Sequence, residues 1–81
     1  MEHYRFSQLT HRIIGCVIEV HKFLGPGLLE SAYEASLIHE LTKDGMRVKN
    51  QIPVPVIYKD IKLNCGYRID IMVEDTVIIE L

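Results

Sequence analysis

The feature that most constrains the fold is an alternation of apolar and polar side chains between residues 61 and 81. Apolar side chains occupy the odd positions of the first run, which are Ile61, Leu63, Cys65, Tyr67, Ile69, Ile71 and Val73. After a polar break at residues 74–76, Val77, Ile79 and Leu81 keep the same phase. Because successive residues of a strand point to opposite faces of a sheet, this pattern predicts a β-hairpin with one apolar face.

The loop length of this hairpin decides which side chains face each other. A two-residue loop would set Asp70 against Ile79 and mix the two faces. A three-residue loop keeps apolar side chains opposite one another, pairing Val73 with Val77, Ile71 with Ile79 and Ile69 with Leu81. In that register Asp70 lies directly across from Glu80. The loop contains no glycine, so we expect Asp75 rather than Thr76 to adopt any left-handed conformation.

Two carboxylates that face each other across a strand pair need a physical reason. Such like-charged pairs destabilise a sheet by about 0.2–1 kcal/mol. A divalent metal ion, which takes carboxylate oxygens as ligands, would offset this repulsion. Asp70 and Glu80 are therefore candidate metal ligands.

Composition indicates one small soluble domain with a thin core, because the chain has 81 residues, of which 48% are hydrophobic and 25% charged. The formal net charge of -2 argues against non-specific coating of nucleic acid. Residues 43–68, however, carry six Lys or Arg against two Asp, whereas residues 69–81 carry four acids and no base. A cationic strip beside an acidic pocket suits a phosphate backbone next to a metal, and a lysine-rich solvated sheet surface explains the pattern equally well.

The cysteines and the lack of a targeting segment bear on the compartment. Cys16 and Cys65 both occupy apolar phases, and we interpret them as reduced core thiols of a cytoplasmic protein rather than a disulfide. The sequence shows no secretory signal and no apolar run long enough to cross a membrane, and its histidines and cysteines lack the spacing of a zinc site.

Two helices are expected before the strands. The first follows Ser7 as N-cap, with the preceding residues as a short leader, and ends at Gly25 and Pro26. The second begins within residues 27–31, with a capping box of Ser31 and Glu34 as an alternative to an early start. It runs to about residue 44, before a glycine at position 45.

A first strand is expected from Met46 to Tyr58. Pro53 and Pro55 are two residues apart, so the N–H groups they lack belong to one side of the strand, which predicts an edge strand. The order helix, helix and three antiparallel strands gives an α+β fold, with the two helices covering the apolar face of a three-stranded meander.

Three segments resemble a known family. Residues 21–33, HKFLGPGLLESAY, contain Gly27, Glu30 and Tyr33 in the arrangement that names the GxxExxY family, and PVIYK at 55–59 and CGYRID at 65–70 extend the resemblance. That family is grouped with the PD-(D/E)XK nuclease superfamily, whose core has a helix, a three-stranded meander, a further helix and a last strand. The resemblance implies that residues 1–81 form a single nuclease-like domain lacking the C-terminal helix and strand.

The resemblance also implies a site. Asp70 matches the aspartate of the second strand, Glu80 the first residue of the E-x-K element, and Glu30 the helix acid that some members add. These carboxylates would hold Mg²⁺ or Mn²⁺ and carry catalysis, with the carbonyl of Leu81 as a further ligand. The activating lysine would fall at position 82, one residue beyond the sequence.

Other residues are assigned supporting roles or none. Lys62 and Arg68 share the strand face of Asp70 in the expected single strand and could supply positive charge. His21 and Tyr33 match the family motif and could support a phosphate, although a helix-end histidine and a half-buried tyrosine explain them better. For Glu30, an acid near a helix N-terminus is favoured by the helix dipole alone, by about 0.3–1 kcal/mol.

Two functions therefore compete. The first is a metal-dependent nuclease-like domain acting on DNA or RNA phosphodiesters, weak or inactive without the lysine. The second is a non-catalytic binding or assembly module that retains an acidic site and is completed by another chain. In both cases we expect no membrane association, and we expect self-association through the C-terminal strand or the apolar sheet face.

Overall fold

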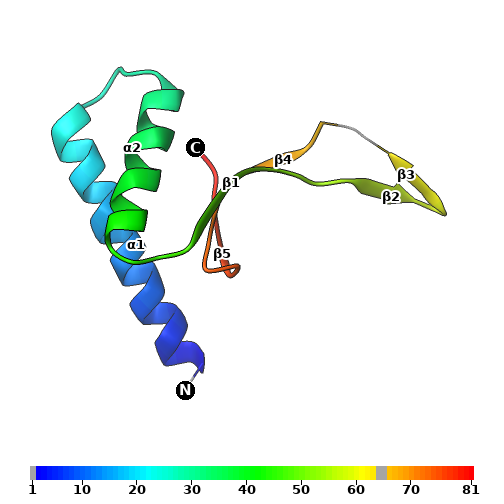
Figure 1. Ribbon diagram of the computed structural model, residues 1–81, viewed down its shortest axis with the longest axis horizontal. Helices are drawn as coiled ribbons and strands as arrows, with labels where there is room; N and C mark the ends of the chain where they lie inside the picture. Colours follow the sequence, from blue (N-terminus) through cyan, green and yellow to red (C-terminus); the bar gives the residue numbers. More distant parts are fainter. Residues whose placement is uncertain (1, 64–65) are drawn as a thin grey trace.

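The computed structural model describes residues 2–63 and 66–81, and Figure 1 shows its layout. The elements in chain order are α1 (Glu2–Leu24), α2 (Glu30–Lys43), β1 (Val48–Pro53), β2 (Val56–Tyr58), β3 (Ile61–Leu63), β4 (Arg68–Val73) and β5 (Val77–Ile79). Strands β1, β4 and β5 form an antiparallel sheet in the order β1-β4-β5, and β2 pairs with β3. Helix α1 packs on α2, which lies against β1 and β4. The α+β class is confirmed.

Helix α1 starts earlier than expected and ends where expected. It begins at Glu2, so Ser7 lies inside the helix and the prediction of an N-cap there is wrong. Residues 2–6 contain neither proline nor glycine, and nothing in their sequence stops a helix from extending through them. At the other end, Gly25 has φ +68° and donates its N–H to the carbonyl of His21 at 2.9 Å, which terminates the helix.

Helix α2 begins without the predicted capping box. Its N-cap is Leu29, which makes no side-chain cap hydrogen bond, and the carboxylate of Glu34 is hydrogen-bonded to Gln51 instead. The helix ends at Lys43 as expected. Gly45, with φ +86°, donates its N–H to the carbonyl of Thr42 at 3.0 Å and closes the last turn.

A small apolar core joins the helices to the sheet. Leu41 of α2 and Ile71 and Val73 of β4 are each 0% exposed. Around them lie further buried side chains from both helices and from the segment before β1: Ile13, Cys16, Val20, Leu37 and Met46. Burial of a single large aliphatic side chain contributes about 1.5–3 kcal/mol, so these few residues supply most of the driving force for folding.

The β4–β5 register agrees with the apolar phase. Ile71 pairs with Ile79 and Val73 with Val77, as the three-residue loop required. In that loop the N–H of Thr76 bonds to the carbonyl of Val73 at 3.0 Å. Asp75 has φ +52°, which confirms its left-handed conformation, but Glu74 has φ +53° as well and was not anticipated. Glu74 and Asp75 are the two central residues of the turn from Val73 to Thr76, and positive φ at both is what a type I′ turn requires.

The two long strands expected from the sequence are each divided in two. The first breaks into β1 and β2 at Val54 and Pro55, and the second breaks into β3 and β4 at residues 64–67. The register shifts by two residues between the two ladders, because Pro53 pairs with Arg68 whereas Val56 pairs with Leu63. The described part of this break contains Gly66, with φ +76°, and one bridging bond from the N–H of Val54 to the carbonyl of Tyr67 at 2.8 Å.

The position of β1 in the sheet agrees with the sequence. In the described sheet β1 pairs with β4 alone, so it is the edge strand that the two prolines predicted.

Cys16 is buried with a free thiol, and burial raises its pKa. Cys65, the other predicted core thiol, lies outside the described residues. Within the part of the chain that the structure describes, neither helix is long and apolar enough to cross a bilayer.

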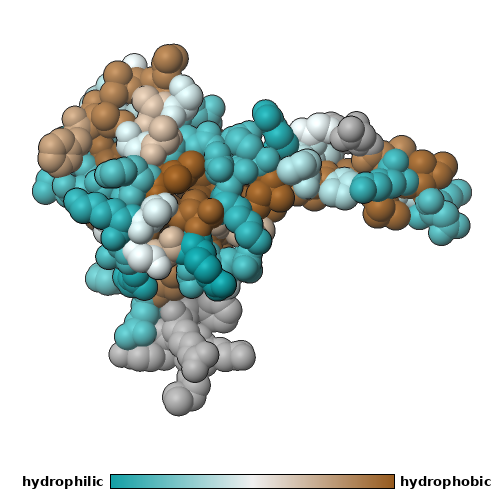
Figure 2. Space-filling model, viewed as in Figure 1, coloured by the Kyte–Doolittle hydropathy of each residue, from teal (hydrophilic) through white to brown (hydrophobic). Residues whose placement is uncertain are grey.

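Beyond the break, β2 and β3 form a hairpin that projects from the rest of the molecule (Figure 1). We call residues 54–63 the arm. No helix covers it in Figure 1, and Figure 2 shows hydrophobic residues along its surface. The predicted covering of the whole meander by the two helices therefore holds for the β1-β4-β5 sheet and not for the arm.

Candidate functional site

The two candidate carboxylates flank the last residue pair of the β4–β5 ladder, because β5 ends at Ile79. Asp70 precedes Ile71, which pairs with Ile79, and Glu80 follows Ile79. One further step in this register places Asp70 opposite Glu80. By strand alternation, Asp70 lies on the face of β4 opposite to Ile71 and Val73, which belong to the core. The side chain of Asp70 therefore belongs to the sheet face away from the core.

Asp70 also holds the end of the chain in place. Its Oδ2 accepts a hydrogen bond from the backbone N–H of Leu81 at 2.9 Å. The side chain of Asp70 is half-buried, whereas that of Glu80 is exposed. The bond keeps the backbone of Leu81 beside the carboxylate of Asp70, which is where the resemblance implied a carbonyl ligand.

The donor set suits a hard divalent cation. Mg²⁺ prefers oxygen ligands and is commonly held by one or two carboxylates while it keeps several waters or takes oxygens from a substrate phosphate. Asp70 lies in β4 and Glu80 is the exposed residue directly after β5, so the chain offers two carboxylates next to the last residue pair of the β4–β5 ladder. The residues present therefore fit a metal of this class.

Glu30 is not brought together with this pair. It is the first residue of α2 and is exposed. Among the described residues, no three His, Cys, Asp or Glu side chains are grouped closely enough to hold one metal ion. The favourable interaction of an acid with the N-terminal end of the helix dipole accounts for the position of Glu30 in this structure.

A different residue of α2 reaches the strands. The side-chain nitrogen of Gln51 in β1 donates to both carboxylate oxygens of Glu34, at 2.8 and 3.2 Å. Gln51 lies between Asn50 and Ile52, whose partners are Ile71 and Ile69, so its place in the ladder is opposite Asp70. Its φ of +50° is rare for a non-glycine residue inside a strand, and such strain often accompanies functional sites.

The supporting residues are distributed over the molecule. Arg68 begins β4, two residues before Asp70, and therefore shares its strand face. Lys62 lies in β3 of the arm, which is a separate ladder, so the single long strand that placed it with Asp70 does not exist. His21 is exposed at the end of α1, and Tyr33 packs against the core while half-buried, in line with their structural interpretations.

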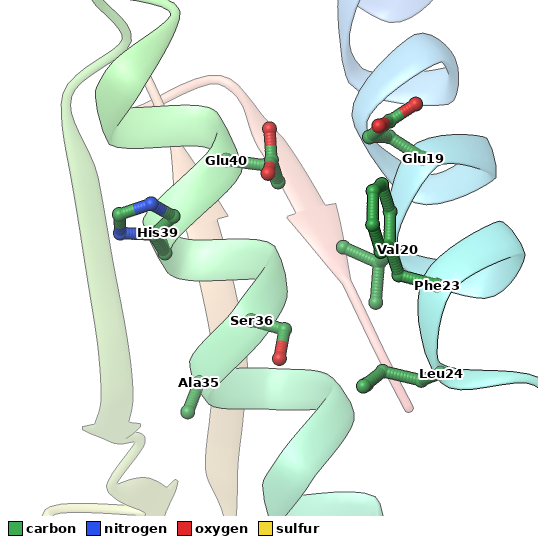
Figure 3. Close-up of a pocket in the computed structure, with 8 residues that line it drawn as sticks. All are labelled: Glu19, Val20, Phe23, Leu24, Ala35, Ser36, His39 and Glu40. Carbon is green, nitrogen blue, oxygen red and sulfur yellow. The ribbon is translucent and has the colours of Figure 1, made fainter.

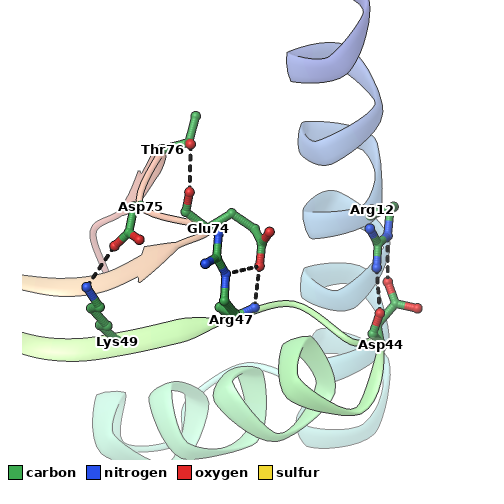
Figure 4. Close-up of polar contacts among 7 residues, drawn as sticks. All are labelled: Arg12, Asp44, Arg47, Lys49, Glu74, Asp75 and Thr76. Carbon is green, nitrogen blue, oxygen red and sulfur yellow. Dashed lines mark hydrogen bonds and ion pairs between the residues drawn. The ribbon is translucent and has the colours of Figure 1, made fainter.

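Part of the predicted cationic strip is neutralised at the β4–β5 turn, as Figure 4 shows. The guanidinium of Arg47 pairs with Glu74 at 3.4 Å, and the ammonium of Lys49 pairs with Asp75 at 2.8 Å. The backbone N–H of Arg47, hydrogen-bonded to Glu74, is the main cause of the lowered pKa of that carboxyl. The hydrogen bond from Lys49 lowers the pKa of Asp75. These two cations therefore stabilise the turn and are less available to a phosphate backbone.

Comparison with known proteins gives one match. Curated proteins and solved structures yield no match. The family model described as the PD-(D/E)XK nuclease superfamily matches residues 7–81, which include most of α1, all of α2 and the strands, and both Asp70 and Glu80. Nucleases of this superfamily are generally dependent on divalent metals. The chain therefore belongs to the PD-(D/E)XK nuclease superfamily.

Proposed function

We propose that this chain is a Mg²⁺-dependent nuclease-like domain that acts on DNA or RNA phosphodiesters through Asp70 and Glu80. The observation that carries the proposal is the β4–β5 register. Apolar phasing alone predicts this register. If the register continues by one residue beyond Ile71 and Ile79, Asp70 lies opposite Glu80, and these are the two acids that match the motif of the superfamily. Sequence motif and strand geometry, which are independent arguments, thus point to the same pair.

Each residue has a distinct role in this proposal. Asp70 and Glu80 hold the metal through carboxylate oxygens, and the backbone carbonyl of Leu81 is held close by the hydrogen bond from its own N–H to Asp70. Arg68, on the same face as Asp70, attracts the phosphate group. A bound Mg²⁺ would supply Lewis acidity and a more acidic water.

Cleavage assays test the proposal directly. Fluorescently labelled single-stranded, duplex and branched DNA, together with RNA, would be incubated with the protein in Mg²⁺, Mn²⁺ or EDTA. We expect metal-dependent cleavage that Asp70→Asn and Glu80→Gln abolish and that Asp60→Asn, at the exposed tip of the arm, leaves unchanged. Cleavage that persists in both site variants would sink the proposal.

The role of Glu30 as a third ligand is tested by binding alone. If Glu30 is a third ligand, as its motif match implies, Glu30→Ala should weaken Mn²⁺ affinity by about tenfold or more, since even groups that only support a ligand contribute 10- to 100-fold. Ser31→Ala, the neighbouring exposed position, is the matched control. Equal Mn²⁺ affinity of Glu30→Ala and the control would leave Glu30 with its role at the helix terminus only.

The alternative function, a non-catalytic binding or assembly module, is favoured by a separate observation. The arm exposes large apolar side chains, among them Ile57, Tyr58 and Ile61. Apolar surface of this kind marks sites of interaction between proteins. Under this alternative, the protein would bind its partner equally well with and without Asp70 and Glu80, and the cleavage assays would show no activity with any metal.

A further inference from the structure

One face of the arm is apolar throughout. Val56 pairs with Leu63 and Tyr58 with Ile61, and strand alternation puts these four side chains on the same face. We call this set the arm face. Tyr58 and Ile61 are 58% and 59% exposed, although a third strand or a helix would normally cover such positions. A two-stranded hairpin is marginally stable in water by itself, so the arm gains stability from a partner that covers this face.

A second uncovered apolar surface lies between the helices. A groove of about 330 Å³ is lined by Glu19, Val20, Phe23, Leu24, Ala35, Ser36, His39 and Glu40. We call it the interhelical groove, and Figure 3 shows its lining residues. Phe23 is 80% exposed, which is unusual for a large aromatic side chain of an otherwise amphipathic helix. The groove therefore offers apolar contact area that the chain itself leaves unused.

The groove is also acidic. Glu19 on α1 and Glu40 on α2 line it from opposite sides, and in Figure 3 both carboxylates lie at the same end. Neither makes an ion pair within the described part of the chain. Two acids flanking an apolar groove favour an occupant that is apolar and positively charged.

The tip of the arm has this chemistry. The ammonium of Lys59 lies 5.6 Å from the centroid of the Tyr58 ring, so a positive charge adjoins the arm face. Lys62 follows in β3 and is exposed. The arm projects on the side of the sheet remote from the helices (Figure 1), and it cannot turn back into its own groove without leaving the ladder that joins it to β1 and β4. A second copy of the chain can present its arm there.

We propose that two copies of this chain associate by exchanging arms. The arm face of each copy packs into the interhelical groove of the other, with Tyr58 beside Phe23 and Lys59 beside Glu19 and Glu40. Exchange in both directions produces two identical contacts related by a two-fold axis, which closes the assembly as a dimer. This surface differs from the C-terminal strand and the apolar sheet face that the sequence suggested for self-association.

Sedimentation velocity of the full chain over a range of concentrations tests the proposal. We expect a monomer–dimer equilibrium whose dissociation constant rises about tenfold or more in Lys59→Glu and in Glu40→Lys. The double variant Lys59→Glu/Glu40→Lys should recover the dimer, because it restores opposite charges at both contacts. Lys22→Glu, on an exposed part of α1 that does not line the groove, should dimerise normally. Circular dichroism would confirm that each variant is folded.

Three outcomes would overturn the proposal. The first is a monomer at every concentration. The second is a dimer that neither single charge reversal weakens, which would place the interface elsewhere, for example on β5. The third is a dimer unaffected by Lys59→Glu while the same variant loses binding to labelled DNA, which would make the arm a nucleic-acid surface. None of these readouts depends on nuclease activity.

Discussion

The substitution Asp70→Asn separates the charge of the candidate site from its hydrogen bond. Asparagine keeps a side-chain oxygen that can accept the N–H of Leu81, which lies 2.9 Å from the carboxylate in the native protein. It removes the negative charge that faces Glu80. Since a like-charged pair across two strands is destabilising by about 0.2–1 kcal/mol, the variant should be more stable by up to about 1 kcal/mol without metal. For a domain of this size that corresponds to a rise in Tm of up to about 4–8 °C.

Added Mg²⁺ should reverse the order of stability. A ligand that binds only the folded state at ten times its Kd stabilises it by about 1.4 kcal/mol, so the native protein should gain about 6–11 °C in Tm. Asp70→Asn should gain little, because one of two carboxylate ligands is lost. Thermal unfolding followed by circular dichroism, with and without MgCl₂ at constant ionic strength, measures both effects. Asp60→Asn is the control and should behave as the native protein does.

The reasoning is refuted by either of two results. If Asp70→Asn is less stable than the native protein without metal, the carboxylates do not repel each other, and the hydrogen bond to Leu81 requires the charge. If Mg²⁺ raises the Tm of the native protein and of Asp70→Asn equally, any metal is bound elsewhere. In both cases Asp70 would be a residue that holds the chain end and nothing more.

Three further predictions concern stability and reactivity. Leu41→Ala, at a fully buried position, should lower the free energy of unfolding by about 2–5 kcal/mol, whereas Leu29→Ala, 77% exposed, should change it by less than about 0.5 kcal/mol in urea titrations. The lowered pKa values of Glu74 and Asp75 mean that both carboxylates stabilise the fold while ionised, so stability should fall as the pH drops below about 4, and a urea midpoint independent of pH between 5 and about 2.5 would contradict this. Cys16, buried and with a raised pKa, should resist iodoacetamide until urea unfolds the protein, as peptide mapping would show.

The hairpin register could be predicted because burial enforces it. Ile71 and Val73 are fully buried, and a slip of one residue would move them to the opposite face of the sheet. The division of the long strands could not be predicted by the same pattern. The β1–β4 and β2–β3 ladders are offset from each other by two residues, and an offset of two preserves the apolar phase of a strand. The alternation from Leu63 to Ile69 therefore continues across a point where the ladder stops.

The candidate site was predictable only where strand pairing determines it. The pairing of Ile71 with Ile79 follows from the apolar phase, and the place of Asp70 opposite Glu80 stays a prediction that continues this register by one residue. The bond between Gln51 and Glu34 depends on how α2 lies over β1 and on a left-handed conformation at Gln51, neither of which leaves a periodic signal. For Glu30 the sequence fails in a different way. The motif match identifies the residue, but it does not determine in which direction the first turn of α2 points.

The β1–β4 and β2–β3 ladders belong to two parts of the protein that differ in packing, and we expect these parts to open as two separate cooperative units. The first is fastened by the buried side chains of β4 and the helices, whereas the second has a ladder of three residue pairs and no buried side chain of its own. Amide hydrogens of the arm should therefore exchange with solvent through local opening at a small fraction of the global unfolding free energy. Opening of the arm would leave Asp70 and the buried side chains of β4 in place. Slower amide exchange of the arm would therefore show that a partner has bound to it.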